Sequence, residues 1–403
     1  MRLEPKPQVP GPKPRMHCKH FGTCGGCSLP GVPYAEQLAQ KRTRLSALLG
    51  MPVPPLVPSP QEAGFRQKVA FVFGQAGPRL VMGHYARGTQ RVVPVDECPV
   101  HGDRGNRIAF ALRDRLARAR VPAAGASRGG ILRHIIIRTT QDQSQAVAML
   151  VVTRNDKSLR TPVRGLLDSP DRPDGFFINI HDRPGPFMVG PETIKIDGHG
   201  HVKEYLRRRS GHTRIGDRGS GIGPTAFLVS PTAFFQTNVG AAEVLQELVL
   251  DSLQDAARVL DLYSGSGLFA LALAQAGATV TAVEENRQAI KDLEANLRLN
   301  HIADGRVRAV CARVEEVLPR VAREPWDAVI LDPPRDGCSP EVLSGIFERM
   351  APRRVVYVSC QPEALARELP FILKAGYRVV QAKAVDMFPH TDHIETVLTL
   401  SRP

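Results

Sequence analysis

DLYSGSGLFALALA, residues 261–274, is the stretch that best defines the fold, because glycines here join an apolar strand to a helix. Asp261 ends the strand-like run, and Gly265 and Gly267 predict a tight turn before the helix. Glycines at such a turn let a ligand approach the backbone N–H groups closely. The stretch therefore predicts a strand–turn–helix unit with a ligand-binding turn.

The alternation of strand and helix continues on both sides of this stretch. Apolar runs predict strands at residues 259–264, 279–285, 307–312, 327–332, 354–360, 377–385 and 393–400. Helices are expected at residues 240–257, 267–277, 286–299, 313–321, 340–350 and 362–375. This order predicts a Rossmann-like α/β fold with a doubly wound, mostly parallel sheet. The last two strands, which MFPHTDH separates, are expected to form a hairpin at the sheet edge.

The N-terminal half has a different pattern. Residues 34–49 have apolar positions at helical spacing, and residues 104–120 predict a basic helix. Short alternating runs between turn residues predict an antiparallel, β-rich α+β domain. These runs are residues 68–74, 79–85, 91–95, 131–140 and 146–153. The expected organisation is a disordered tail (1–15), a β-rich domain (16–225) and an α/β domain (226–403).

The net charge of +13 is unevenly distributed. Residues 1–225 contain 35 Lys and Arg against 17 Asp and Glu, a net of +18, and residues 226–403 contain 18 against 23, a net of −5. A basic half joined to a mildly acidic half predicts a polyanionic partner, although a general excess of arginine is an alternative explanation. The Arg/Gly-rich segment 206–222 is expected either to contact phosphates or to form a solvated face.

Targeting signals and membrane spans are lacking in the sequence. No run approaches the roughly 20 apolar residues of a membrane span, and the Pro/Lys-rich start lacks the apolar region of a signal peptide. We therefore expect a cytoplasmic protein. The odd number of cysteines, seven, then predicts ligands or catalysts rather than disulfides.

Four cysteines of the N-terminal half form a candidate metal site. Cys18, Cys24 and Cys27 follow the pattern C-x5-C-x2-C, and Cys98 lies in VDECPVH. Four thiolates suit an iron–sulfur cluster, but zinc and unrelated thiols are alternatives. Zinc ribbons usually have two close pairs, whereas only Cys24 and Cys27 are close here, so the spacing favours the cluster.

Two reactive side chains stand at predicted strand ends near the C-terminus. Cys360 follows the apolar run of VVYVSCQPEALARELP (355–370), and Glu395 lies in FPHTDHIETVLTL (388–400). Sheets of this type bind ligands at the carboxyl ends of their strands, and the helix that follows Cys360 would favour its thiolate. A buried structural cysteine and a solvent-facing carboxylate are the alternatives. Cys311 and Cys338 are interpreted as structural.

The ligand at the glycine turn has three interpretations. Glu284 ends the next predicted strand, where its carboxylate would accept hydrogen bonds from ribose hydroxyls. Ala270 replaces the third glycine of the dinucleotide fingerprint, which favours S-adenosylmethionine; a dinucleotide and a purely structural turn remain alternatives. Asp332 ends another strand before two prolines, which would present a rigid surface to a ligand.

Together these motifs resemble the RNA uracil-5 methyltransferase family, and the N-terminal cysteines resemble its iron–sulfur branch. The resemblance covers about residues 16–403. It implies a class I methyltransferase domain that transfers a methyl group from S-adenosylmethionine to C5 of uridine in RNA. It also implies that the β-rich domain carries a [4Fe–4S] cluster and binds RNA.

The resemblance implies roles for individual residues. Cys360 would be the nucleophile that adds to uracil C6, which makes C5 nucleophilic, and Glu395 would remove the C5 proton. The implied cofactor contacts are Gln236, Tyr263, Gly265, Gly267, Glu284 and Asp332, and the implied cluster ligands are Cys18, Cys24, Cys27 and Cys98. Arg313 departs from the family pattern of Asp or Asn, which leaves the adenine contact open.

Other residues near these motifs have weaker assignments. Phe234 and Phe235 are interpreted as core rather than as a base-stacking platform. His390 and His393 flank the Glu395 motif and are candidates for substrate contacts, and Arg335 is a candidate phosphate ligand. The target uridine must leave its stack to expose C6.

The expected substrate is large-subunit (23S) ribosomal RNA. Only about 17 residues precede Cys18, so the closest resemblance is to the shorter enzymes without an N-terminal β-barrel domain. Transfer RNA, at U54, is the alternative substrate, and a monomer is expected. A dehydrogenase with a zinc site and a non-catalytic RNA-binding protein on a methyltransferase fold are the competing function classes.

Overall fold

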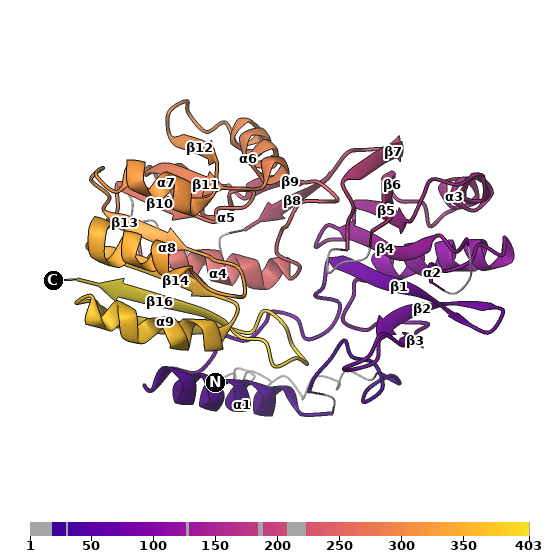
Figure 1. Cartoon of the computed structure of the whole chain (residues 1–403), viewed down its shortest axis with the longest axis horizontal. Coiled ribbons are helices and arrows are strands. Elements are labelled where there is room, and N and C mark those ends of the chain that lie inside the picture. The colour runs from indigo at the N-terminus through magenta and orange to yellow at the C-terminus, as the bar shows by residue number, and fades with distance from the viewer. Residues whose placement is uncertain (1–17, 30, 126–128, 184–187, 208–222, 403) are drawn as a thin grey trace, which may run out of the picture.

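The structure, a computed structural model, describes residues 18–29, 31–125, 129–183, 188–207 and 223–402. The expected tail 1–15 and nearly all of the Arg/Gly-rich segment 206–222 lie outside the described residues. Within these, the strands form two seven-stranded sheets and one two-stranded sheet. Figure 1 shows the two large sheets side by side, with the first helix running along the lower edge of the molecule.

The C-terminal sheet has the strand order β12-β11-β10-β13-β14-β16-β15. Its strands are β10 Arg258–Leu262, β11 Thr279–Glu284, β12 Val307–Cys311, β13 Ala328–Leu331, β14 Arg354–Ser359, β15 Arg378–Val385 and β16 Glu395–Ser401. The first five are parallel, whereas β16 runs antiparallel to both β14 and β15. The predicted strand–helix alternation and the terminal hairpin are therefore confirmed.

Helices cover both faces of this sheet. They are α4 Val239–Asp251, α5 Leu268–Gln275, α6 Arg287–Leu299, α7 Val314–Val321, α8 Pro340–Ser344 and α9 Pro362–Lys374. Side chains alternate across a strand, so Val259 packs with α4, α5 and α6 while Leu260 packs with α7, α8 and α9. The helix expected at 340–350 is α-helical only in its first part, because residues Gly345–Met350 are π-helical.

The N-terminal sheet has the order β3-β2-β1-β4-β5-β6-β7. Its strands are β1 Lys68–Ala76, β2 Arg79–Tyr85, β3 Val92–Pro94, β4 Leu132–Thr139, β5 Ala146–Val152, β6 Gly175–Ile180 and β7 Glu192–Gly198. The pairings among the five predicted strands, β1 to β5, are antiparallel as predicted. Strands β6 and β7, which were not predicted, pair antiparallel with each other, and β5 and β6 are parallel. A helix that was not predicted, α3 Arg160–Leu167, connects these two strands and permits the parallel crossover.

The two halves share one hydrophobic core. Helix α2 (Asp103–Arg118) and α3 cover one face of the N-terminal sheet. Residues on its other face, such as Met149 and Phe177, belong to the same buried cluster as α4 and α5. Helix α1 (Tyr34–Leu49) packs against α9, with Leu45 and Leu49 buried among residues of the C-terminal sheet (Figure 1). None of the described helices is long and apolar enough to span a membrane.

A two-stranded sheet, β8 (Val202–Leu206) and β9 (Thr225–Val229), precedes the glutamine motif SPTAFFQTN. Polar side chains of α6 at helical spacing bond the free edge of β9. Asn300 accepts from the Ala226 N–H at 2.8 Å and Asn296 accepts from the Leu228 N–H at 2.7 Å. One turn earlier, the Ser230 hydroxyl donates to Asp292 at 2.7 Å. Helix α6 thus satisfies the exposed backbone groups of β9 and fixes the start of the glutamine motif.

Candidate active site

Strand register brings the two predicted reactive residues to one edge of the C-terminal sheet. Ser359 at the end of β14 pairs with Thr396 near the start of β16. Since the strands are antiparallel, the next residues outward from this pair are Cys360 and Glu395. Asp332 directly follows the parallel strand β13 at the same edge. The thiol and two carboxyl groups therefore gather where the parallel strands end.

The carboxyl groups of this edge are held in an environment that disfavours their charge. Glu395 is buried, and burial followed by the nearby Asp332 raises its pKa well above the ordinary value, while Arg335 acts in the opposite direction. Burial and then Glu284 raise the pKa of Asp332. A carboxyl with a raised pKa takes up a proton readily near neutral pH, so Glu395 is suited to proton transfer.

The thiol of Cys360 does not have the lowered pKa expected from the helix that follows it. Burial, followed by Glu395 and Asp332, raises its pKa to about 11, and Arg335 acts in the opposite direction. Two acidic groups and desolvation outweigh the dipole of α9 here. The prediction of a thiolate favoured by the helix is therefore wrong for the unliganded protein.

The glycine turn has the geometry that its sequence predicts. Gly265 and Gly267 have φ angles of 55° and 94°, in the left-handed region that favours glycine. A Cβ on Gly267 would also overlap Leu271 and Leu293. Tyr263 has a φ of 64°, which is unusual for a residue other than glycine. The turn is thus a locally strained segment held between β10 and α5.

Glu284, the expected acceptor for ribose hydroxyls, is hydrogen-bonded to the glycine turn. Its carboxylate accepts from the Gly265 N–H at 3.0 Å and from the Asn286 N–H at 2.8 Å. A pocket of about 330 Å³ lies beside this carboxylate. Its lining includes Tyr263, Glu284, Arg313 and Gly337. Arg313, the residue that departs from the family pattern, therefore lines the same pocket.

Asp261 is a buried carboxyl group with little hydrogen bonding. It has 0% exposure, and neither of its oxygens forms a hydrogen bond of good geometry with the described residues. Burial, followed by Asp332, raises its pKa well above the ordinary value, while the nearby Ala270 N–H acts in the opposite direction. Buried polar groups are nearly always satisfied, so this carboxyl fits a ligand that brings a cationic or N–H donor to the glycine turn.

The glutamine motif, residues 230–238, is held by backbone and amide hydrogen bonds. The Gln67 N–H donates to the Thr237 carbonyl at 2.6 Å, and the Asn238 amide donates to the Met387 carbonyl at 2.9 Å. Gln236 directly precedes Thr237 and Asn238 and is 9% exposed. The segment that carries Gln236 therefore adjoins the loop that leads to Glu395.

The interpretation of the phenylalanine pair as core is right for one ring and wrong for the other. Phe235 is buried against Phe227, with ring centroids 5.2 Å apart. Phe234 is 66% exposed. The two neighbouring rings therefore face opposite sides of the irregular motif before α4. Phe234 therefore presents an aromatic face to solvent two residues before Gln236.

The histidines near Glu395 differ in their surroundings. Both ring nitrogens of His390 have partners, since Nδ1 lies 3.1 Å from the Gln37 amide and Nε2 lies 2.8 Å from the Glu62 carbonyl. His390 is therefore engaged in the fold rather than directed to a substrate. His393 is half-buried and packs edge-on against Phe388, with ring centroids 5.8 Å apart.

Of the two cysteines interpreted as structural, Cys338 is buried and Cys311 is exposed. The Cys338 N–H donates to Glu368 at 2.8 Å, and the Tyr357 hydroxyl donates to the same carboxylate at 2.6 Å. This network fixes the segment after Asp332 onto α9. Glu368 had no recognisable signal in the sequence, because a single acidic residue on a helix gives no pattern.

The four N-terminal cysteines line one cavity. Its wall contains Cys18, Cys24, Cys27, Cys98, His20, His84, His101 and Arg66. Burial, followed by Cys24, raises the pKa of Cys27 to about 11, so the thiols are close enough to influence one another. The sequence spacing alone had placed Cys98 with the other three, and the structure brings all four together.

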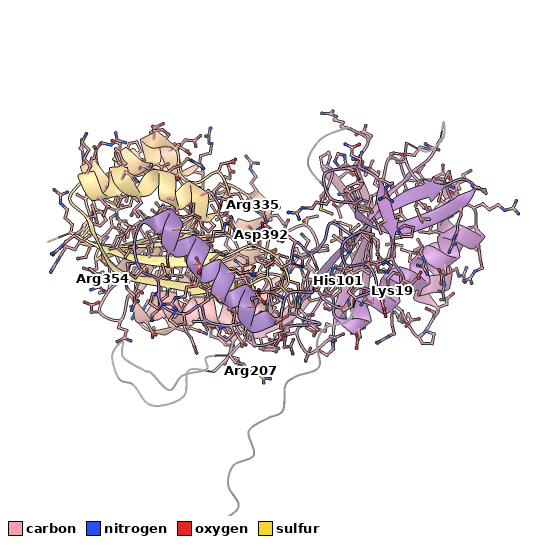
Figure 2. All side chains as sticks on the ribbon, turned by 90° about the horizontal axis from the view of Figure 1, so that it is seen from below. Lys19, His101, Arg207, Arg335, Arg354 and Asp392 are labelled. Atoms are coloured by element: carbon pink, nitrogen blue, oxygen red, sulfur yellow. The ribbon has the colours of Figure 1, made fainter. Side chains whose placement is uncertain are left out.

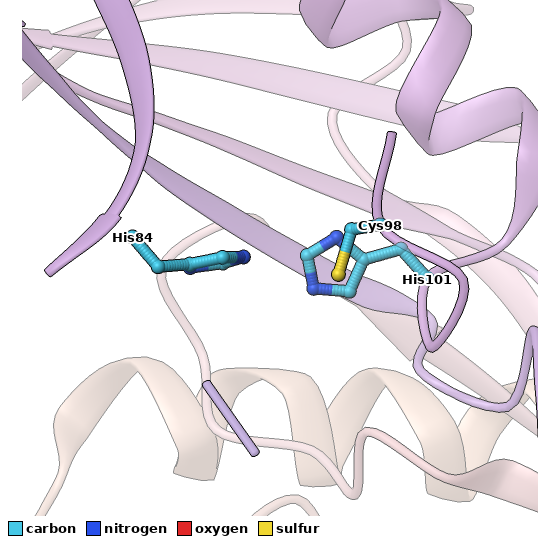
Figure 3. Close-up of side chains that lie close together, drawn as sticks. All are labelled: His84, Cys98 and His101. Carbon is cyan, nitrogen blue, oxygen red and sulfur yellow. The ribbon is translucent and has the colours of Figure 1, made fainter. Parts of the chain in front are cut away.

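The three histidines of this cavity, His20, His84 and His101, were not predicted, and two of them lie close to Cys98. The ligand atoms of His84, Cys98 and His101 all lie within 4.8 Å of one another, and the three side chains point toward one another (Figure 3). His101 is buried, and its Nδ1 has no hydrogen-bond partner among the described residues. Isolated histidines in separate segments give no sequence signal, although His101 lies only three residues after Cys98.

Arg66 joins the cysteine cavity to the catalytic half. It lines the cavity, and its Nε has no hydrogen-bond partner in the described part of the chain. Its guanidinium carbon also lies 5.8 Å from the centroid of the Phe388 ring. A cation without a carboxylate partner beside four cysteines fits an anionic group in the cavity.

Comparison with known proteins extends this picture. A family model described as tRNA (Uracil-5-)-methyltransferase matches residues 225–403. An uncharacterized RNA methyltransferase of Gloeobacter violaceus is 33% identical over 397 residues, which cover 96% of this chain and 82% of that protein. A similar protein of Geobacter sulfurreducens is 32% identical over 396 residues, which cover 95% and 76% of the two chains.

A solved structure resembles the whole arrangement. The tRNA (uracil-54, C5)-methyltransferase of Pyrococcus abyssi, in complex with S-adenosyl-L-homocysteine, superposes with a TM-score of 0.77 at 27% identity. The match covers 94% of this chain and 84% of that one. This likeness agrees with the class I methyltransferase fold of the C-terminal sheet. The chain therefore belongs to the RNA uracil-5-methyltransferase family and is an RNA methyltransferase.

Proposed function

We propose that this protein methylates C5 of a specific uridine in RNA through a covalent bond between Cys360 and uracil C6. The observation that carries this proposal is the register of β14 and β16, which sets Cys360 beside Glu395 where the parallel strands end. A thiol and a buried base are the two groups that substitution at C5 requires. The same edge holds Asp332 and the glycine turn.

The residues present fit S-adenosylmethionine, which supplies an electrophilic methyl group when bound. Asp261, buried and with little hydrogen bonding, suits the ammonium group of an amino-acid moiety. Glu284 and Tyr263 line the adjoining pocket, where ribose and adenine would fit. Gln236 and Asp332 would contact the cofactor and the uracil, and Gly265 and Gly267 allow the close approach.

Each chemical step assigns one task to one residue. The Cys360 thiol loses its proton to solvent and forms an S–C6 bond, which places the displaced π electrons on the C5–C4–O4 enolate. C5 would then gain the methyl group as the methyl–sulfur bond of the bound donor breaks, which leaves a neutral thioether. Glu395 takes the C5 proton, the C5–C6 double bond re-forms and the S–C6 bond breaks. The raised pKa of Glu395 helps it to accept that proton.

Large-subunit (23S) ribosomal RNA is the substrate we propose, because the four-cysteine group resembles that of the iron–sulfur branch. Transfer RNA at position 54 is the second candidate, and the Pyrococcus abyssi neighbour favours it. The basic residues of 16–225 would bind the RNA phosphates, and residues 226–403 would carry out the reaction in a cytoplasmic monomer.

We also propose that Cys18, Cys24, Cys27 and Cys98 hold a [4Fe–4S] cluster. The shared cavity and Arg66, whose Nε has no hydrogen-bond partner among the described residues, support this assignment, because the cluster and its thiolates carry net negative charge. Zinc is the second candidate, favoured by the grouping of His84, Cys98 and His101. Anaerobic purification followed by iron, sulfide and zinc analysis distinguishes the cluster from zinc. Zinc without iron would overturn the cluster assignment.

The reaction is tested with labelled methyl donor and unmodified ribosomal or transfer RNA, followed by nucleoside mass spectrometry. We expect 5-methyluridine in one RNA. Cys360→Ala should abolish the product while donor binding stays within twofold, and Cys311→Ala, at an exposed thiol, is the matched control. RNA with 5-fluorouridine at the target should form a stable adduct with the wild type, since C5 then has no proton to lose. Loss of donor binding in Cys360→Ala would contradict the nucleophile role.

A further inference from the structure

We propose that the cysteine loop, residues 18–29, positions the active-site loop, residues 386–393, and that Ser28 is the positioning residue for Glu395. The inference rests on the proposed function, in which Glu395 is the base. The two loops are separated by more than 350 residues in sequence. Their contact gives the cysteine cavity a direct physical connection with the catalytic edge.

Four hydrogen bonds join the two loops. The N–H groups of Ser28 and Leu29 both donate to the His390 carbonyl at 3.0 Å. The Ser28 hydroxyl donates to the Asp392 carboxylate at 2.9 Å, and the Asp392 N–H donates back to that hydroxyl at 2.8 Å. Ser28 directly follows Cys27, which lines the cysteine cavity. The hydrogen-bonded segment therefore begins next to that cavity.

The active-site loop needs external support. It connects β15 to β16, and Glu395 is the first residue of β16. His390 has a φ of 66°, which residues other than glycine rarely adopt. Asp392 lies only three residues before Glu395, and Figure 2 shows Asp392 and Arg335 close to the junction of the two halves. The position of Asp392 therefore limits where β16 can begin.

Other contacts hold the far side of this loop. Lys41 of α1 donates to Asp386 at 2.7 Å and to the Phe388 carbonyl at 3.2 Å. The Gln37 amide oxygen accepts from the His390 N–H at 2.8 Å. These groups belong to a long helix, so they are fixed by the core. At Asp392 the two supports meet, because Arg44 of α1 donates to the Asp392 carbonyl at 2.8 Å while Ser28 of the cysteine loop bonds the Asp392 carboxylate and N–H.

The cysteine loop has little regular structure of its own. In its described residues it contains turns and one isolated bridge, between Cys24 and Ala86. Its shape therefore depends on what its cysteines bind. Arg66 adds a second connection, because it lines the cavity and stands over the ring of Phe388. Binding at the cysteines would thus stabilise the position of the base.

The first experiment compares hydrogen–deuterium exchange of residues 386–395 in the wild type and in Ser28→Ala, without RNA or methyl donor. Ser158→Ala is the matched control, since Ser158 donates to Asp156 at 2.8 Å in the same manner but lies in the N-terminal half. We expect Ser28→Ala to speed exchange and to slow single-turnover methyl transfer, each by about three- to tenfold, as for the loss of one or two hydrogen bonds. Metal content and donor affinity should stay within twofold.

Two further variants separate the hydrogen bond from charge. Asp392→Asn retains an oxygen that accepts from Ser28 and should behave as the wild type, whereas Asp392→Ala should behave as Ser28→Ala. Cys27→Ser should speed exchange in residues 386–395 as well as in 18–29. An unchanged exchange pattern of 386–395 in Ser28→Ala, or equal effects of the two Asp392 variants, would overturn the inference. A wild type that methylates neither RNA would overturn the proposed function, and the exchange experiment does not depend on that result.

Discussion

Cys360 and Glu395 lie at the same edge of the sheet because Ser359 pairs with Thr396 across antiparallel strands. This relationship has an electrostatic consequence. Burial raises the pKa of the Cys360 thiol to about 11, and the neighbouring Glu395 adds to that effect. The base of the proposed reaction thus influences the ionisation of the nucleophile before any substrate is bound.

Opposite changes in the Cys360 pKa are expected from two variants. A carboxylate disfavours the nearby thiolate, so Glu395→Gln should lower the thiol pKa below about 11. The Arg335 guanidinium favours the thiolate, so Arg335→Gln should raise it. The rate of iodoacetamide alkylation at Cys360, followed against pH by peptide mass spectrometry, reports this pKa. Shifts in the same direction for both variants would contradict the arrangement of charges.

Alanine should lower the unfolding free energy by different amounts at Gly265 and Gly267 of the glycine turn. Gly265→Ala meets open space and should cost about 1 to 2 kcal/mol, the penalty of the left-handed backbone. Gly267→Ala carries the same penalty and also overlaps Leu271 and Leu293, so the loss should reach about 3 kcal/mol or more. Urea unfolding of the unliganded protein measures both. Equal losses would show that the overlap relaxes freely.

The buried ion pair of α1 should matter more to stability than a surface pair. Lys41 and Asp386 are 2% and 0% exposed and lie 2.7 Å apart. Lys41→Met leaves a buried carboxylate unpaired and should cost about 3 to 5 kcal/mol. Arg164→Met, in a pair that is 86% and 71% exposed, should change stability by less than about 0.5 kcal/mol. Denaturant unfolding measures the loss of unfolding free energy in both variants. A small loss in Lys41→Met would mean that the pair is in contact with water.

The phenylalanine pair should separate RNA binding from folding. Phe234→Ala removes an exposed ring and should leave the unfolding free energy nearly unchanged. If the ring stacks on a base, RNA affinity should fall by about fivefold to 100-fold. Phe235→Ala should instead cost about 3 to 5 kcal/mol, because its ring is buried. Filter binding with a substrate fragment measures affinity, and unaltered affinity in Phe234→Ala would exclude stacking.

The catalytic half was largely predictable from its sequence because its signals are local. Buried parallel strands are continuous apolar runs, so the ends of these runs located Asp261, Asp332 and Cys360 at one sheet edge. The hairpin of the last two strands then brought Glu395 to the same place. The position of Arg66 beside the cysteines had no local signal, since it depends on two segments that meet only in the folded chain.

The other differences between the prediction and the structure arise from contacts between segments that are far apart in the sequence. Strand β9 follows the long segment 208–222, so its sequence carries no signal of a short hairpin connection, and its edge is bonded by side chains in and just after α6 that are far away in sequence. The helix that follows Cys360 in the sequence suggested a lowered pKa for its thiol. The direction of the pKa shift depends instead on burial and on carboxyl groups from other strands. The exposure of Phe234 likewise depends on how its irregular segment is held.

The shared core of the two halves also constrains how such a protein could evolve. Met149 and Phe177 of the N-terminal sheet are buried with residues of α4 and α5 in one cluster. A catalytic half transferred by recombination onto another chain would carry an uncovered apolar face, a surface that favours aggregation. Exchange of RNA-binding modules is therefore expected outside this pair of halves, at the chain termini, while the pair itself is inherited as a unit.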